Sequence, residues 1–153
     1  MKRISFNYNE QTDLKEALLG RPEKIFVSHI GNHIPNSITL WKGQKGIRIY
    51  STIYEFSDRI EVGYLNFKET YETMHDDVLI DNKIPEEHLI NINKLLIEVD
   101  HCVIECGIEL CFKHPLYILS GAMPFSLAVN FIEKDGYLFD PAYDMNEYTR
   151  ESL

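Results

Sequence analysis

Ten residues, Ile47-Arg-Ile-Tyr-Ser-Thr-Ile-Tyr-Glu-Phe56, decide the fold class of this chain. They are rich in β-branched and aromatic side chains, which favour β-strands over helices. Successive side chains of a strand point to opposite faces. Both faces carry large apolar groups here: Ile47, Ile49 and Ile53 on one, Tyr50, Tyr54 and Phe56 on the other. We therefore expect a strand that the rest of the protein covers on both faces.

Similar patterns lie on both sides of this stretch, separated by turn sequences that contain glycine, asparagine, aspartate or proline. The predicted strands are Lys24–Ile30, Ser37–Lys42, Ile47–Phe56, Arg59–Phe67, Leu89–Val99, Cys102–Phe112, Leu116–Ser120 and Phe125–Ile132. In the last of these, Phe125, Leu127, Val129 and Phe131 alternate with smaller or polar residues. Such alternation indicates a half-buried strand.

A short helix is expected near the N-terminus, with Asp13 as its N-cap, Glu16 as the capping-box partner and Gly20 at its end. The strands fall into two consecutive groups, which predicts an α+β fold that is mainly antiparallel β. Two β-meanders would form a sandwich or a partly open barrel with one or two short helices. The length of 153 residues suits a single domain, 1–153.

The chain is acidic, with 24 Asp and Glu residues against 15 Lys and Arg residues and a net charge of −9. Such a field repels nucleic-acid phosphates and anionic membranes, so we expect a basic protein as the partner instead. The N-terminus lacks the layout of a signal peptide, and no apolar run is long enough to cross a bilayer. A cytoplasmic location with reduced cysteines is therefore expected.

The acidic residues concentrate in two segments. Residues 68–87 are expected to form a long acidic connection, and residues 140–153 form an acidic tail. Acids interleaved with aromatic residues suit a protein-binding face, because aromatic side chains supply desolvated anchors and carboxylates steer a basic partner. The predicted protein-binding residues are Asp76, Asp77, Asp81, Glu86, Glu87, Asp144, Glu147 and Tyr148. A solvated surface without a partner is the alternative.

Histidine and cysteine spacings do not match a metal or catalytic site. His29 and His33 have the spacing of a helical metal pair, but the intervening glycine and the nearby proline disfavour a helix, so both are expected in a loop. Cys102 and Cys106 lie about 13 Å apart on an extended strand, too far to bind one ion together. Cys111 completes a set expected to be core thiols. We predict no catalytic residue, cofactor or metal ion, and a non-enzymatic role is favoured while the enzymatic one stays open.

Two parts of the sequence carry a resemblance. The first is Asp58-Arg-Ile-Glu-Val-Gly-Tyr-Leu-Asn-Phe67. The second is Ser120-Gly-Ala-Met-Pro-Phe-Ser-Leu-Ala-Val129 with the tail Asp140-Pro-Ala-Tyr-Asp-Met-Asn-Glu-Tyr-Thr-Arg150. Both are similar to stretches of small acidic bacterial proteins of unassigned function, and the resemblance implies no catalytic residue. In size, acidity and expected fold the chain also looks like the immunity proteins that neutralise bacterial toxins, which is a likeness of general character.

These observations lead to one main expectation and two alternatives. We expect a non-enzymatic protein-binding protein, an immunity-type inhibitor that neutralises a basic bacterial toxin by covering its active surface. The first alternative is a small enzyme or ligand-binding β-barrel with an internal polar site that uses His101, His114 or buried carboxylates. The second is an oligomeric structural subunit whose exposed apolar face includes Trp41 and Tyr50. The protein is expected to be a monomer or a homodimer.

Overall fold

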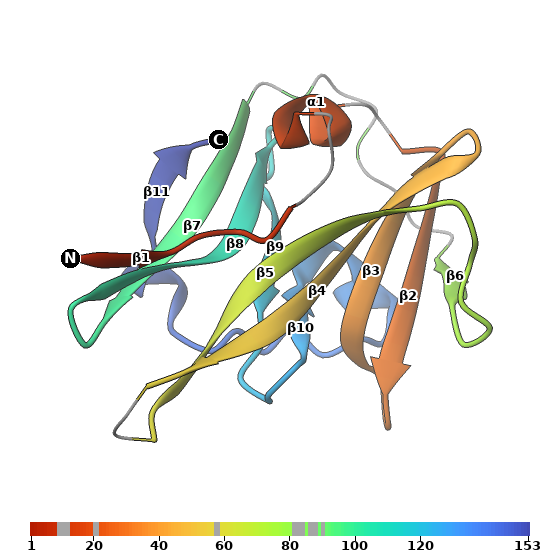
Figure 1. Ribbon diagram of the computed structural model, residues 1–153. Coiled ribbons are helices and arrows are strands. Elements are labelled where there is room, and N and C mark those ends of the chain that lie inside the picture. Colours follow the sequence, from red (N-terminus) through yellow and green to blue (C-terminus); the bar gives the residue numbers. More distant parts are fainter. Residues whose placement is uncertain (9–12, 20–21, 57–58, 81–84, 86–88, 90) are drawn as a thin grey trace.

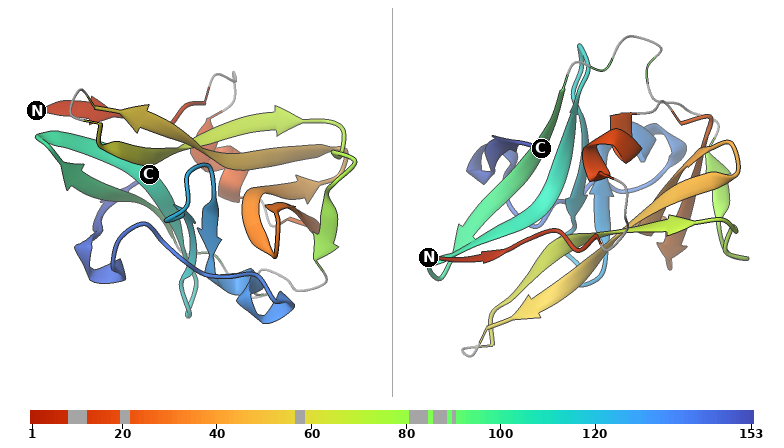
Figure 2. Two further views of the ribbon diagram at one scale, coloured as in Figure 1. Left: turned by 90° about the horizontal axis from the view of Figure 1, so that it is seen from below. Right: turned by 45° about the horizontal axis from the view of Figure 1, so that its top comes forward.

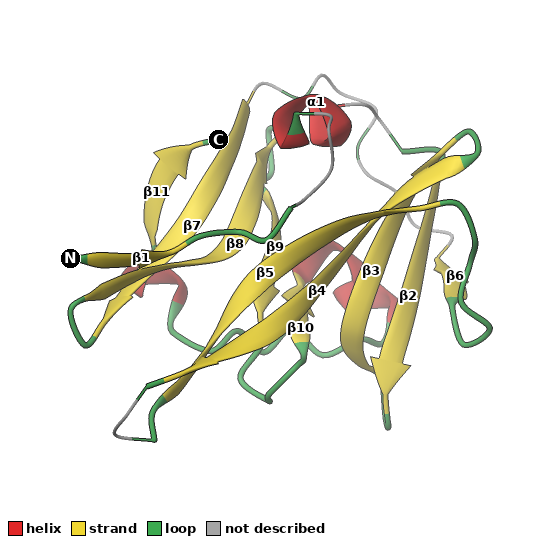
Figure 3. Cartoon of the chain, in the orientation of Figure 1, coloured by secondary structure: helices red, strands yellow, loops and turns green. Residues whose placement is uncertain are grey.

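A computed structural model describes residues 1–8, 13–19, 22–56, 59–80, 85, 89 and 91–153 (Figure 1). Antiparallel strands form two sheets, and the helices are short (Figure 3). The first sheet contains β2 (Lys24–Ile30), β3 (Ile34–Lys42), β4 (Lys45–Glu55), β5 (Glu61–Thr70) and β6 (Val78–Ile80). The second contains β1 (Lys2–Ile4), β7 (Asn91–Val99), β8 (Cys102–Cys111), β9 (Leu116–Ser120), β10 (Leu127–Val129) and β11 (Thr149–Ser152). The helices are α1 (Leu14–Leu19) and the 3-10 helices η1 (Asn130–Asp135) and η2 (Met145–Glu147).

Each half of the chain forms a β-meander, which confirms the mainly antiparallel prediction. Strands β2 to β5 are neighbours in sequence order in the first sheet, and β7 to β10 are neighbours in the second. All the ladders within these two groups are antiparallel. Three further strands extend the meanders, since β6 lies beside β2, β11 lies beside β7, and β1 runs parallel to β8.

The N-terminal segment passes from the second sheet to the first (Figures 1 and 2). After β1 pairs with β8, Asn7 forms a parallel bridge with Asn66 of β5. The Asn7 N–H donates to the Leu65 carbonyl at 3.2 Å, and the Phe67 N–H donates to the Asn7 carbonyl at 2.9 Å. This segment therefore joins the two sheets along one seam.

The two sheets pack on a shared apolar core. Alternate residues of the first sheet point into it, including the fully buried Val27, Ile38, Ile49 and Leu65. The second sheet contributes Ile92, Ile108, Leu110, Ile118, Leu127 and Val129. Full burial of one such side chain contributes about 1.5–3 kcal/mol relative to exposure. Two sheets that share one core are consistent with the predicted sandwich arrangement.

Helix α1 lies over one end of the core (Figure 1). It begins where the sequence predicts, because the Lys15 N–H donates to Asp13 Oδ1 at 3.1 Å and so satisfies one free donor of the first turn. Leu18 is its buried residue and packs on the core. Gly20, the predicted end, lies outside the described residues. Among the described helices, none is both long and apolar enough to cross a membrane.

The predicted acidic connection over residues 68–87 is wrong in its described part. Strand β5 continues to Thr70, and Val78–Ile80 form β6, in which Ile80 lies opposite Ile25 of β2. Three apolar residues among acids give a weak local signal, and pairing with the edge of β2 is what makes them a strand. The connection between β5 and β6 is therefore only the turn of residues 71–77.

The predicted strand Phe125–Ile132 is also shorter in the structure. Only β10 pairs with β9, and the next residues form η1. Asn130 explains the end of the strand, because its Oδ1 accepts the Tyr117 N–H at 2.8 Å and its Nδ2 donates to the Pro115 carbonyl at 3.1 Å. Phe125 lies outside the strand, at φ +64° and 55% exposed, so it does not join the inward face.

Trp41 is buried rather than exposed, with 8% of its surface accessible. It lies opposite Gly46 on β4, where an added Cβ would come within 3.1 Å of the indole ring and 2.8 Å of Thr39 Cγ2. Glycine at position 46 therefore leaves room for the indole to lie against the sheet. The expected apolar face for self-association cannot include Trp41, which corrects that part of the oligomeric alternative.

Candidate functional site

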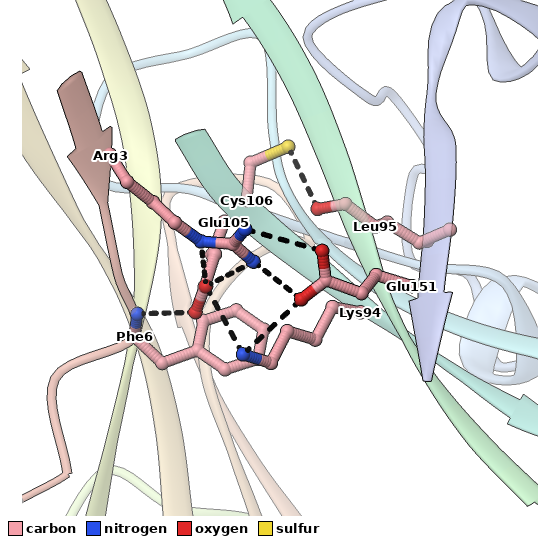
Figure 4. A network of polar contacts seen from close by, with 7 residues as sticks. All are labelled: Arg3, Phe6, Lys94, Leu95, Glu105, Cys106 and Glu151. Carbon is pink, nitrogen blue, oxygen red and sulfur yellow. Dashed lines mark hydrogen bonds and ion pairs between the residues drawn. The ribbon is translucent and has the colours of Figure 1, made fainter. Parts of the chain in front are cut away.

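A buried carboxylate on β8, Glu105, lies at the centre of a polar network that includes side chains of three other strands (Figure 4). Its Oε2 accepts from Arg3 Nε at 2.8 Å and from Lys94 Nζ at 3.1 Å, and its Oε1 accepts the Phe6 N–H at 2.8 Å. Arg3 also pairs with Glu151 on β11 at 2.7 Å. The Glu105 side chain is only 2% exposed. The network thus joins β1, β7, β8 and β11.

A β-bulge creates this geometry. The register moves from Leu95 opposite Gly107 to Leu96 opposite Glu105, so Cys106 is an extra residue on β8. The bulge places Glu105 on the same face as Lys94. Arg3 Nε and NH2, Lys94 and the Phe6 N–H together match the roughly four lone-pair sites of a carboxylate. Because the protein itself fills these sites, we assign Glu105 a structural role.

The three cysteines are free, and Cys102 and Cys106 are buried as predicted, whereas Cys111 is only partly buried. The Cys106 thiol donates to the Leu95 carbonyl with a sulfur–oxygen distance of 3.4 Å. Burial raises the pKa of the Cys106 thiol to about 12. Burial and the neighbouring Glu109 carboxylate also raise the pKa of Cys111. Neither thiol resembles an activated nucleophile, which needs a lowered pKa.

Cys106 is expected to resist alkylation as long as the protein is folded. At pH 8 a thiol with a pKa of about 12 is ionised in only about one molecule in ten thousand, and burial also blocks the reagent. Iodoacetamide labelling followed by peptide mass spectrometry measures this, with the protein in guanidinium as the control in which all three cysteines react. Labelling of native Cys106 at the rate of an ordinary exposed thiol would contradict the assignment.

His29 and His33 lie side by side, although only His33 is in a loop and His29 belongs to β2. The turn places His33 at φ +59°, and the two ring centroids are 5.6 Å apart. Tyr137 packs edge-on against both rings, at 5.8 and 5.2 Å. Over the described residues no group of three His, Cys, Asp or Glu could hold a metal ion. The pair is therefore an aromatic contact between the β2–β3 turn and the segment after η1.

The histidines expected at an internal polar site lie elsewhere. His101 is in the turn between β7 and β8, at φ +60°, and His114 is in the turn between β8 and β9. Both residues are exposed. Turn positions at the surface do not bring either ring into the interior of the fold, so the part of the barrel alternative that relied on them is wrong.

The turn of residues 71–77 carries two of the predicted binding residues. The Asp77 carboxylate pairs with Arg48 at 3.0 Å and accepts the Met74 N–H at 2.7 Å, and its side chain is 1% exposed. Asp76 is exposed and accepts the Ser28 hydroxyl at 2.8 Å, a hydrogen bond that lowers the pKa of its carboxyl group. Asp77 therefore holds the turn on the sheet and is unavailable to a partner, whereas Asp76 is accessible.

The other six predicted binding residues differ in whether the structure describes them and in whether they are exposed. Three of them, Asp81, Glu86 and Glu87, lie outside the described residues. Asp144 and Glu147 are exposed and form the capping box of η2, in which the Asp144 N–H donates to Glu147 Oε2 at 3.0 Å. Tyr148 is 4% exposed, and its hydroxyl accepts the Tyr143 N–H at 3.1 Å. Tyr148 is therefore a buried packing residue, and its ring is not exposed as a contact residue would be.

A groove of about 480 Å³ opens beside the turn of residues 71–77, and we call it the polar groove. Its floor is the face of the first sheet that points away from the shared core, where Ser37 lies opposite Ser28 and Tyr50. Arg48 lies opposite Lys68 on the same floor. Its lining includes Asn36, Tyr50, Lys68, Met74, Asp76 and Phe125. The groove thus combines both signs of charge with hydroxyl and amide groups.

Asn36 lines the polar groove because of a second β-bulge. The register moves from Ser28 opposite Ser37 to His29 opposite Pro35, which leaves Asn36 as an extra residue on β3. Its Oδ1 is buried and has no hydrogen-bond partner within the described part of the chain. Bulges commonly re-aim a side chain next to a functional site. Asn36 therefore lines the groove with a side chain whose Oδ1 is unpaired within the described residues.

A second depression, of about 300 Å³, lies between the β4–β5 hairpin and the loop of residues 121–126, and we call it the aromatic depression. Ser51 and Phe125 line both it and the polar groove, so the two are neighbours. Met123 in the same loop is 44% exposed. A positive φ is a rare conformation for a bulky residue such as Phe125. The loop thus presents two large apolar side chains to solvent.

Hydrogen bonds hold this loop in one shape. The Gly121 N–H donates to the Ser126 carbonyl at 2.8 Å, and the Ser126 hydroxyl donates to the Met123 carbonyl at 2.6 Å. The Ala122 N–H donates to the Asp140 carbonyl at 2.9 Å. These hydrogen bonds fix the conformation of the loop, and the one from Ala122 also ties the loop to the C-terminal segment. The loop therefore holds Phe125 outward.

A third depression, of about 480 Å³, lies on the C-terminal segment, and Asp140, Asp144 and Glu147 line it. We call it the acidic depression. Ala142 and Tyr143 line both it and the aromatic depression, so the three depressions form a row with the aromatic one in the middle. We call this row the grooved face. It connects the two segments that the sequence marks as acidic.

Comparison with protein-family models, with curated proteins and with solved structures finds no match for this chain. The chemistry of the grooved face then follows from its geometry. Its carboxylates can pair with basic groups, and Met123 and Phe125 can be desolvated by a partner. Asn36 and Lys68 add an acceptor and a donor at the polar end. These are the properties of a binding surface.

Proposed function

We propose that the protein is a non-enzymatic, immunity-type inhibitor that neutralises a basic bacterial toxin by covering its active surface in the cytoplasm. The observation that supports this is the exposure of Met123 and Phe125 in the middle of the grooved face, with carboxylates toward both ends. Exposed apolar groups within a polar rim are typical of protein interfaces. Phe125 also has a positive φ, a conformation that is rare for a bulky side chain.

The charge of the face favours a basic partner. Five carboxylates line it, Asp76 at the polar groove, Glu61 at the aromatic depression, and Asp140, Asp144 and Glu147 at the acidic depression, against the basic Arg48 and Lys68 at the polar groove. The net charge of −9 extends this attraction over the whole molecule. Oppositely charged surfaces accelerate association, and salt screens the effect beyond about 8 Å at physiological ionic strength. Binding would thus be fast and would weaken as salt is added.

We expect the triple variant Asp140→Asn, Asp144→Asn, Glu147→Gln to slow association with the partner about tenfold at low salt and to flatten its salt dependence. The partner is first captured from the native cells, purified and tested for toxicity, and binding rates are then measured by interferometry. The control is Glu23→Gln, Glu98→Gln, Glu133→Gln, which changes the net charge equally at exposed positions away from the depressions.

Two results would contradict the proposal. One is an equal slowing of association in the two triple variants, because the attraction would then not be localised on the grooved face. The other is a captured partner that is not toxic to cells, or whose toxicity remains when this protein is expressed with it.

A further inference from the structure

We propose that the grooved face binds an extended peptide segment of the partner, with a basic side chain in the acidic depression and an apolar side chain against Phe125. This inference rests on the proposed function and specifies the form in which the partner is recognised. It adds the polar groove and Asn36 to the residues that make the contact.

The arrangement of the depressions supports an extended ligand. The aromatic depression shares Ser51 and Phe125 with the polar groove, and Ala142 and Tyr143 with the acidic depression. The three sites therefore lie in a fixed order. An extended chain places every second side chain on the same side, about 6–7 Å apart, and so can fill successive depressions.

Each depression favours a different kind of side chain. Among the described residues, the lining of the acidic depression contains three carboxylates and no basic side chain, so it complements lysine or arginine. The aromatic depression contains Ile53, Val62, Met123, Pro124 and Phe125, so it favours an apolar side chain. This difference fixes the direction in which the peptide segment lies on the face.

The polar groove can hold the main chain of such a segment. Asn36 lines the groove, and its Oδ1 is buried and has no partner among the described residues, so a rotation of this side chain into the groove would let it accept a peptide N–H. Lys68 is exposed at the same groove and can donate to a carbonyl. A peptide bond offers both groups together, which matches this pair of side chains.

The test uses a phage library of linear 12-residue peptides selected against the whole protein. Recovered peptides are synthesised, and their affinities are measured by fluorescence anisotropy. We expect a shared pattern of one basic and one apolar residue, with binding at least tenfold weaker to Phe125→Ala and to the triple variant of Asp140, Asp144 and Glu147. Asn36→Ala should also weaken binding. Leu138→Ala, at a side chain that is likewise 55% exposed, is the matched control and should bind normally.

Peptides that bind all the variants equally, or that lack the basic residue, would overturn the inference. It would also be overturned if no peptide is recovered while the purified partner still binds and loses affinity with Phe125→Ala. That result would mean that the face recognises a folded surface, and the proposed function would stand. If the native protein binds no partner at all, the proposed function itself is wrong.

Discussion

Replacing Glu105 with alanine is expected to lower the free energy of unfolding by about 3 kcal/mol, because removing one member of a buried ion pair leaves charged and polar groups without a partner. Arg3, Lys94 and the Phe6 N–H all donate to this carboxylate. Strands β1 and β11 are only 3 and 4 residues long and are mostly exposed, so apolar burial stabilises them little. The Glu105 network therefore carries much of their attachment to β7 and β8.

Urea denaturation of the variant and the native protein measures the loss. Glu151→Ala is the matched control, since Glu151 belongs to the same network but its side chain is 45% exposed. Exposed ion pairs contribute little, so this variant should lose far less stability than Glu105→Ala. Equal losses of unfolding free energy in the two variants would show that the burial of Glu105 does not determine how much the network stabilises the protein.

Much of the fold could be predicted because strand and turn signals are local. Alternating apolar residues and turn sequences indicated both meanders, and β2 and β9 have the predicted bounds. The short strands β1, β6 and β11 were not predicted, because they are defined by pairing with distant strands. Their side chains alone carry too little pattern to distinguish a strand from a loop.

The candidate site was harder to predict, because its residues reach it through features that a local pattern does not reveal. The predicted acidic segments, 68–87 and 140–153, each contain residues that line one end of the grooved face, but their acidity did not reveal that Asp77 pairs with Arg48 beneath the turn. Asn36 reaches the polar groove through a bulge in the β2–β3 pairing. Phe125 continued the alternation of β10, although the preceding Gly-Ala-Met-Pro is a turn signal that could have placed it in a loop.

Replacing Phe125 with glycine is expected to change stability and binding in opposite directions. At φ +64° a residue with a Cβ is strained and glycine is not, so the free energy of unfolding should rise by about 1 kcal/mol. The side chain is 55% exposed, so little buried apolar area is lost. Loss of an aromatic anchor from an interface costs about 2 kcal/mol, so binding of a selected peptide or of the partner should weaken about thirtyfold.

Phe125→Ala separates the two effects, because alanine removes the ring but keeps the Cβ and hence the strain. It should bind as weakly as the glycine variant without gaining its stability, and urea denaturation with peptide anisotropy measures both. A loss of about 3–5 kcal/mol in either variant, the cost of truncating a core phenylalanine, would show that the ring is needed for folding. A ring that folding does not need but binding does need would be an anchor for the partner, as the proposed function expects.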